Sequence, residues 1–275
     1  MSEIWDSVAP GWEANAPFVD GQLAEATSAM LDLAHVEEGE EVLELGAGPG
    51  GAGLAAAERV GPSGSVVLSD VSAEMMAVAD RRPRGGASVS TAVLDQSAID
   101  FPDRSFDVVC SRHVLMFAED PRAAVREAVR VLRPGGRYVT MTWDRRACNP
   151  WLGLVLDAVG EQFGVPFPPP GVRGPFSLDD LDGLDSVLRG GGLDAVSARQ
   201  MASPMRAGSL TEWWNRVPQL AGPLAMALAG MEAEVREAIA ERAMRAGART
   251  AAQDGDAIVF DGSVLIGSGV KPRTG

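Results

Sequence analysis

The residues best suited to chemistry are a glycine cluster and a set of polar side chains that directly follow short apolar runs. The first run, residues 41–45, contains Glu44 and leads into Gly46, Gly48 and Gly50. Gly46 and Gly48 can adopt a positive φ and let the backbone approach a ligand that a Cβ atom would repel. A segment with helical composition follows at once, and the N–H groups and dipole of its N-terminus would point at the same ligand. The stretch therefore predicts a loop that binds a nucleotide-like molecule.

This loop alone is compatible with two kinds of cofactor. Gly46, Gly48 and Gly51 satisfy the G-x-G-x-x-G pattern of dinucleotide-binding proteins. With Gly50 in place of Gly51, the same loop satisfies the acidic-x-G-x-G-x-G pattern of methyltransferases. The residues at the other strand ends are needed to distinguish between the two kinds of cofactor.

Polar side chains also follow three later apolar runs. They are Asp70, Asp95-Gln96 and Ser111-Arg112-His113. Parallel sheets bind ligands beyond the carboxyl ends of their strands, so we expect these side chains to meet there. Asp70 could accept hydrogen bonds from both hydroxyls of a ribose, and Asp95 with Gln96 could meet the amine of an adenine. An isolated Asp at a strand end more often caps a helix or turn, but two at equivalent positions beside a glycine loop favour a nucleotide site.

The elements that would position these side chains alternate between strand and helix. Strands are predicted near residues 42, 66, 90, 107 and 138, with helical segments between most of them. This alternation is the signature of a doubly wound α/β sheet. Before it, residues 3–34 are predicted to form two helices, broken at Pro10-Gly11.

The second half of the chain departs from this alternation. The pattern predicts helices over residues 149–163 and from Ser177 to the glycines at 190–192, a strand over 193–201 and a helical insertion over 209–248. A closing strand is predicted over 257–270, with Asp261-Gly262 as the place for a bend. The expected fold is therefore α/β: a Rossmann-like, doubly wound, mostly parallel seven-stranded sheet with a helical cap near the C-terminus.

These motifs together resemble the class I S-adenosylmethionine-dependent methyltransferases, and most closely the small-molecule enzymes similar to the ubiquinone/menaquinone-biosynthesis C-methyltransferases. The matching segments are residues 42–50, 67–76, 95–96, 101–109 and 131–137. The resemblance implies transfer of a methyl group from S-adenosylmethionine to a small molecule, with S-adenosylhomocysteine as product. It also implies a single domain, 1–275, made of lid helices (1–38), a cofactor-binding core (39–145), acceptor-side helices with one strand (146–256) and the closing strand.

By this resemblance, the glycine loop would hold the methionine part of the cofactor. Gly46, Ala47, Gly48 and Gly50 would approach that part, and Glu44 would organise the loop and the bound amino group.

The nucleoside part would be held at the next two strand ends. Asp70 would take the ribose hydroxyls and Val71 would lie against the adenine, while Asp95 would meet the adenine amine with Gln96 beside it.

The end of the fourth strand provides a candidate base. By the resemblance, Ser111 and Arg112 would border the methionine end of the cofactor. His113 lies just beyond them and is the first candidate for a general base, with packing or capping as the alternative. Many family members carry an aromatic residue at this position, so no catalytic role is transferred from them. The only other histidine, His35, precedes the first strand and is expected at the surface.

Five of the six tryptophans lie in segments that the resembled family places around the acceptor. They are Trp12, Trp143, Trp151, Trp213 and Trp214. Any one tryptophan more often packs in the core, but together they predict a flat, apolar or aromatic acceptor.

The composition of the chain limits which binding partners are expected. A formal net charge of −14 argues against nucleic acid or an anionic membrane. The chain has neither an apolar run of about 18 residues nor a secretory signal, and its two cysteines, Cys110 and Cys148, lack C-x-x-C spacing. We therefore expect a cytoplasmic protein without a structural metal; no oligomeric state is predicted.

Three function classes remain open on the sequence. The first is a small-molecule methyltransferase, with transfer to oxygen, nitrogen or carbon undecided. The second is a protein that binds S-adenosylmethionine without transferring its methyl group, and the third is a nicotinamide-dependent oxidoreductase. The oxidoreductase has no need for Asp95-Gln96 or for the turn at residues 133–136.

Overall fold

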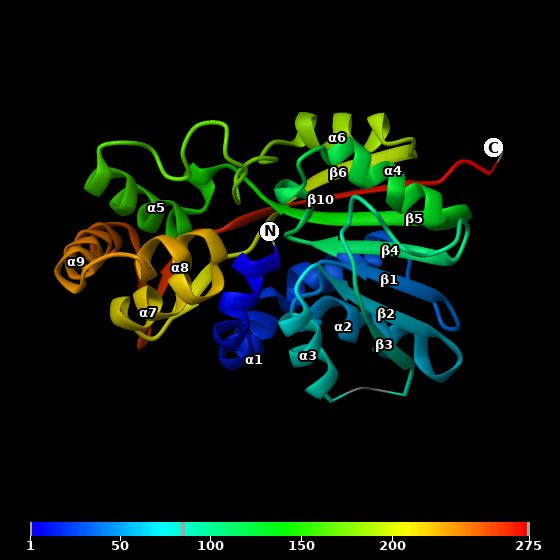
Figure 1. Ribbon diagram of the computed structural model, residues 1–275, viewed down its shortest axis with the longest axis horizontal. Coiled ribbons are helices and arrows are strands. Elements are labelled where there is room, and N and C mark those ends of the chain that lie inside the picture. Colours follow the sequence, from blue (N-terminus) through cyan, green and yellow to red (C-terminus); the bar gives the residue numbers. More distant parts are fainter. Residues whose placement is uncertain (1, 84–85, 274–275) are drawn as a thin grey trace.

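A seven-stranded sheet forms the centre of the computed structural model, which describes residues 2–83 and 86–273 (Figure 1). The strand order is β3-β2-β1-β4-β5-β10-β6, and the first five strands are parallel. The antiparallel β10 lies between β5 and β6. This confirms the predicted doubly wound, mostly parallel sheet. The strands are β1 (Glu41–Leu45), β2 (Ser65–Asp70), β3 (Ser88–Val93), β4 (Phe106–Arg112), β5 (Leu132–Trp143), β6 (Asp194–Ala202) and β10 (Ser263–Val270).

Helices cover both faces of this sheet (Figure 1). On one face lie α1 (Ser2–Leu33), α2 (Gly51–Val60) and α3 (Ala73–Arg81), and on the other α4 (Pro121–Val131) and α6 (Leu181–Gly190). Successive residues of a strand point to opposite faces, so Val42 packs into the first layer and Leu43 into the second. The inner strands β1 and β4 are largely apolar in their middle because both of their faces are covered, whereas the edge strands β3 and β6 are largely exposed.

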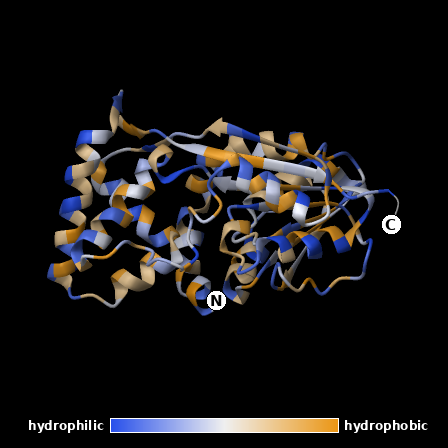
Figure 2. Cartoon of the chain, turned by 90° about the horizontal axis from the view of Figure 1, so that it is seen from above, coloured by the Kyte–Doolittle hydropathy of each residue, from blue (hydrophilic) through white to orange (hydrophobic). Residues whose placement is uncertain are grey.

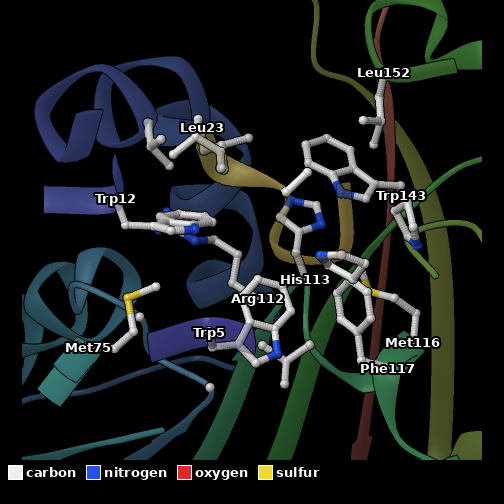
Figure 3. Close-up of a pocket in the computed structure, with 18 of the residues that line it drawn as sticks. Trp5, Trp12, Leu23, Met75, Arg112, His113, Met116, Phe117, Trp143 and Leu152 are labelled. Atoms are coloured by element: carbon white, nitrogen blue, oxygen red, sulfur yellow. The ribbon is translucent and has the colours of Figure 1, made fainter. Parts of the chain in front are cut away.

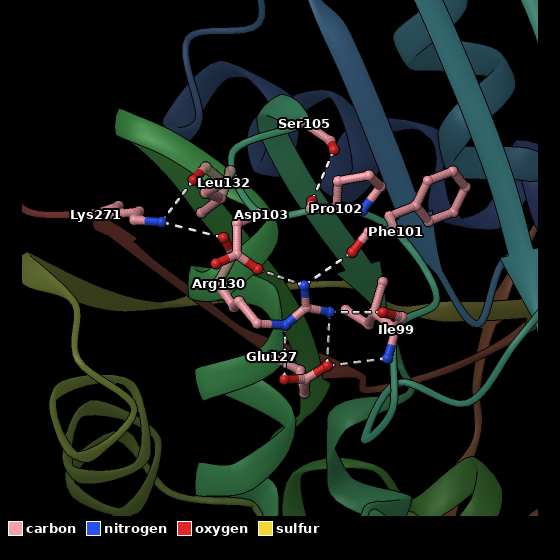
Figure 4. Close-up of polar contacts among 9 residues, drawn as sticks. All are labelled: Ile99, Phe101, Pro102, Asp103, Ser105, Glu127, Arg130, Leu132 and Lys271. Carbon is pink, nitrogen blue, oxygen red and sulfur yellow. Dashed lines mark hydrogen bonds and ion pairs between the residues drawn. The ribbon is translucent and has the colours of Figure 1, made fainter.

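The segment between β3 and β4 is tied to α4 by one arginine (Figure 4). Arg130 donates to the carbonyls of Ile99 and Phe101, at 2.6 and 2.8 Å, and pairs with Asp103 and Glu127. Arg130 thus gives the partly buried carbonyls of Ile99 and Phe101 a hydrogen-bond partner and holds the turn at residues 101–105 against α4.

The remaining helices form a cap at one end of the sheet. They are α5 (Pro150–Phe163), α7 (Leu210–Leu220), α8 (Gly222–Ala229) and α9 (Ala233–Thr250). A small antiparallel sheet of β7 (Met205–Ala207), β9 (Ala257–Phe260) and β8 (Ala252–Asp254) joins them. The cap has a hydrophobic core of its own, and its helices show mixed apolar and polar faces in Figure 2.

The N-terminal prediction was wrong: residues 2–33 form one helix, which continues through Pro10 and Pro17. The contacts of α1 with α2, α3, α7 and α8 outweigh the weak local break. Gly11 serves this packing, because a Cβ there would lie 2.7 Å from the carbonyl oxygen of Gln219 at the end of α7.

Three further boundaries differ from the predictions. The closing strand, predicted as one strand with a bend at Asp261-Gly262, divides there into β9 in the cap and β10 in the main sheet; a Cβ on Gly262 would lie 1.9 Å from the Ser203 carbonyl oxygen. The helix expected to begin at Ser177 is capped by Asp180, whose Oδ1 accepts from the Gly183 N–H at 2.7 Å. The fifth strand starts at Leu132 rather than near residue 137. Within residues 2–83 and 86–273, no helix is long and apolar enough to cross a membrane.

Candidate active site

A pocket lies where the carboxyl ends of β1, β2 and β4 meet α1 and the cap (Figure 3). One half is lined by the predicted cofactor residues, including Glu44, Gly48 and Asp70. The other half is lined by α1, the end of β5 and the cap. The sequence-predicted strand ends thus converge on one cavity.

The glycine loop lines the pocket at Gly46, Ala47 and Gly48, but only Gly48 has open space on the side where a Cβ would lie. A Cβ on Gly48, where φ is 53°, would meet no atom within 4 Å. A Cβ on Gly46 would instead lie 2.3 Å from Cγ2 of Val114. Gly46 therefore makes room for the segment after β4, whereas Gly48 leaves open space where a ligand can approach the backbone.

Asp70 fastens this loop to the end of β2. Its Oδ2 accepts from the Gly48 N–H and its Oδ1 from the Ser72 N–H, both at 2.9 Å. Burial raises the pKa of this carboxyl, and the backbone N–H groups of Ser72 and Gly48 oppose the shift. Each carboxylate oxygen has a second lone pair, so the side chain can still accept from two hydroxyls.

Glu44 is a buried carboxyl at the floor of the cofactor half. Its Oε2 accepts from the Gly53 N–H in α2 at 2.7 Å. Burial raises the pKa of Glu44 to about 7, and the charge of Arg112 opposes that rise. A cationic ligand group beside Glu44 would favour its ionised form.

Arg112 connects the sheet to α1. Its guanidinium donates to Thr27 Oγ1 at 2.9 Å and lies 3.8 Å from Asp20, which also pairs with Arg82. The same helix is fastened near its start, where Asp6 accepts from the Ser72 hydroxyl at 2.6 Å. The sequence indicated a lid but not these anchors, because acidic residues on a helix carry no signal of their partners.

Of the other predicted cofactor residues, some line the pocket and some do not. Val71, Asp95 and Gln96 line the pocket, and Gln96 Oε1 is buried without a hydrogen-bond partner. Ala47 lines it as well, whereas Gly50 is the N-cap residue of α2.

Ser111 lies elsewhere. It is fully buried in the sheet, where its hydroxyl bonds Tyr138 and Thr140 at 2.9 and 2.8 Å.

His113 projects into the junction of the two halves (Figure 3). Its imidazole stacks on Trp143, with ring centres 3.7 Å apart and planes 9° apart. Both ring nitrogens are buried without a partner. Burial, and then the charge of Arg112, hold the pKa of His113 well below its usual range.

The structure separates the five predicted acceptor tryptophans. Trp12, Trp143 and Trp151 line the pocket, and so does Trp5, which was not among them. Trp213 is fully buried in the cap, where its indole donates to the Trp151 carbonyl at 2.8 Å. Trp214 packs beside the same cap core.

The cap contributes an apolar wall to the pocket. Among the described lining residues beyond position 145, Ser203 alone has a polar side chain. The wall includes Trp151, Leu152, Leu156, Val217, Leu220 and Leu224.

Comparisons with known proteins agree with this geometry. Residues 43–140 match the family model described as a methyltransferase domain. The ubiquinone/menaquinone biosynthesis C-methyltransferase UbiE of Bordetella avium is 29% identical over 71% of this chain and 80% of its own length.

Solved structures share the fold. A complex of the Haloferax volcanii Trm112 methyltransferase activator with a methyltransferase contains a chain that aligns with a TM-score of 0.61 at 20% identity, over 97% of each chain. The geranyl diphosphate C-methyltransferase of Streptomyces coelicolor, solved with S-adenosylhomocysteine, aligns with a TM-score of 0.51 at 16% identity, over 90% of this chain and 78% of that one.

The fold and the site therefore define an enzyme that uses S-adenosylmethionine. The residues fit this cofactor: Gly48 leaves open space, Glu44 and Asp70 present carboxyls, and Gln96 has a free acceptor. The chain is a class I S-adenosylmethionine-dependent methyltransferase. The nicotinamide-dependent alternative is excluded. Among the described residues, no cluster of His, Cys, Asp or Glu could hold a metal ion.

Proposed function

We propose that this methyltransferase acts on a small, uncharged acceptor with a flat, apolar or aromatic body. The observation that supports this proposal is the apolar cap wall: Leu220, Leu224 and Trp151 line the pocket there, and among the described lining residues none beyond position 145 is charged. Apolar walls bind apolar surface and give no compensation to a buried ion. Such an acceptor fits a biosynthetic role, as in the relatives named above.

The cofactor-binding residues are assigned by their places around the pocket. We assign the methionine amino group to Glu44, the ribose hydroxyls to Asp70 and the adenine to Val71 with Asp95 and Gln96. Ala47 and Gly48 border the methionine part and Arg112 its far side, while Gly46 and Gly50 shape the loop. S-adenosylmethionine supplies an electrophilic methyl group on a sulfonium sulfur. The enzyme's main task is to align acceptor and methyl group and to exclude water.

We place the reaction in the cytoplasm, because both cysteines are free thiols and one of them, Cys110, is buried in the sheet. The net charge of −14 supports a small-molecule acceptor rather than nucleic acid or a membrane surface.

The proposal is tested by incubating the protein with methyl-labelled S-adenosylmethionine and a panel of flat apolar acceptors, beside charged analogues of the same size. We expect S-adenosylhomocysteine release and a labelled product with the uncharged compounds. Binding of S-adenosylmethionine without transfer to any compound would favour a non-methylating role.

Two matched variants test whether the apolar cap wall binds the acceptor. Leu220→Asp places a carboxylate in it, while Met226→Asp places one on the exposed surface of α8. We expect Leu220→Asp to lower kcat/KM for the acceptor at least tenfold at unchanged cofactor affinity, and Met226→Asp to have no effect. Equal behaviour of the two variants would contradict an apolar acceptor.

A further inference from the structure

The imidazole of His113 is a polar group with nothing to bind within the described structure. A neutral imidazole has one N–H donor and one acceptor nitrogen. Both nitrogens of His113 are buried and unpaired, and the residue lines the pocket. Buried polar groups nearly always have partners, so an unsatisfied one in a ligand cavity points to the ligand.

The backbone and the stacking partner hold this ring in one place. His113 has a φ of 59°, in the left-handed region that is costly for most residues, and its N–H donates to the Met141 carbonyl at 2.8 Å. Such strained residues cluster at functional sites. The Trp143 ring lies parallel to the imidazole, so the ring cannot turn freely.

The position of the ring is next to the methionine end of the cofactor site. The following residue, Val114, packs on Gly46 of the glycine loop. On the other side, Trp143 makes an edge contact with Trp151, at 5.1 Å between ring centres, and so leads into the cap wall. His113 therefore lies between the cofactor half and the acceptor half.

We propose that the acceptor carries a hydroxyl group on its flat ring, as a phenol or enol does, and that His113 binds this hydroxyl and accepts its proton. This inference rests on the proposed function and names the acceptor's reacting group. As the oxygen–methyl bond forms and the sulfonium sulfur–methyl bond breaks, the proton passes from the hydroxyl oxygen to a ring nitrogen of His113. The products are a methyl ether, a neutral thioether and an imidazolium that returns its proton to water.

Other acceptor groups match the site less well. A neutral amine attacks with its own lone pair and needs no base before transfer, and a carboxylate would require a cation. The nearby cation, Arg112, already binds Thr27 and lies beside Asp20. Burial lowers the pKa of His113, so the ring is neutral at pH 7 and one ring nitrogen has a lone pair that can accept a hydroxyl hydrogen.

The binding arm of the test uses the ring ¹⁵N signals of the histidines. The chain has only two, so a His113→Asn spectrum assigns them. In the complex with S-adenosylhomocysteine, 2-naphthol should shift the acceptor nitrogen of His113 most, 2-naphthylamine, a weaker donor, should shift it less, and 2-methoxynaphthalene, which has no donor, should leave it in place. No shift with 2-naphthol, or an equal shift with all three, would overturn the proposal.

The kinetic arm uses two variants that tolerate the left-handed backbone, His113→Asn and His113→Gly. We expect a 10²- to 10⁴-fold loss of single-turnover methylation of 2-naphthol, unchanged S-adenosylmethionine affinity, and partial rescue of His113→Gly by added imidazole. A loss below threefold, or transfer to carbon or nitrogen, would overturn the hydroxyl assignment. If the protein binds S-adenosylmethionine and methylates only acceptors without a hydroxyl, the proposed function stands and this inference falls.

Discussion

His113 and Trp143 lie in parallel contact, 3.7 Å between ring centres, at the junction of the cofactor and acceptor halves of the pocket. His113 directly follows β4 and Trp143 is the last residue of the neighbouring parallel strand β5, and these two strands end at the same edge of the sheet. The stack excludes water from one face of the imidazole, and burial is the main reason that the pKa of His113 is depressed.

This contact predicts that His113 stays neutral over an unusual pH range. The unfolded chain takes up a proton at this residue below about pH 6.5, whereas the folded protein does so only at lower pH. We therefore expect neutral ¹⁵N ring shifts for His113 from pH 8 to 6.5, and a loss of stability from this residue as the pH falls below 6.5. Arg112 is the charged group that acts on it. A ring that is half protonated at pH 6.5 or above would contradict the burial.

Glu44 predicts a pH-dependent cofactor affinity. Its pKa is about 7 in the free protein, and a bound ammonium group would favour the ionised form. Binding should release a proton below pH 7, so the S-adenosylmethionine affinity should rise with pH between about 5.5 and 7.5. Calorimetry in buffers of different ionisation enthalpy measures both effects. In Glu44→Gln, which can still accept from the Gly53 N–H, the dependence should vanish; if it persists, another group is responsible.

The two loop glycines should respond differently to alanine. Gly46→Ala forces a methyl group against Val114 at a positive φ, and we expect a loss of about 2–4 kcal/mol in the free energy of unfolding. Gly48→Ala meets only the backbone cost of about 1 kcal/mol, but places its methyl group where the cofactor must approach. Its S-adenosylmethionine affinity should fall at least tenfold. Gly21→Ala, with open space around it, is the control in both assays.

Trp213 should matter for stability and not for the acceptor. Trp213→Phe leaves the Trp151 carbonyl without its donor and opens a cavity in the cap, which costs roughly 2–4 kcal/mol. The acceptor KM of the remaining folded enzyme should stay within threefold. Leu220→Ala, in the pocket wall, should show the reverse pattern. A Trp213→Phe enzyme with normal stability and a raised KM would place that ring in the acceptor site.

Residues whose role depends on local pattern were predictable from the sequence. The glycine loop follows β1, Asp70 ends β2 and Gln96 lies just after β3, and the geometry of parallel strands brings them to one edge. The central sheet followed from the same alternation.

Residues whose role depends on packing could not be predicted from the sequence. Neighbouring helix positions such as Trp213 and Trp214 point in directions about 100° apart, and only the packed cap decides which is buried. Trp5 was expected only within the lid segment and not in the acceptor set, and the continuous helix α1 brings it to the pocket.

Calorimetric titration of S-adenosylmethionine into the protein and into Asp70→Asn most directly tests the claim that the cofactor binds at the carboxyl ends of β1 and β2. Asp70→Asn puts an amide N–H₂ against the N–H of Gly48 or Ser72 and removes the charged acceptor for the ribose. We expect one site per chain in the parent, a 10- to 100-fold weaker affinity in Asp70→Asn, corresponding to about 1.4–2.8 kcal/mol, and no change in the exposed control Asp100→Asn. A parent that does not bind S-adenosylmethionine, or an Asp70→Asn protein that binds it equally well, would contradict the account.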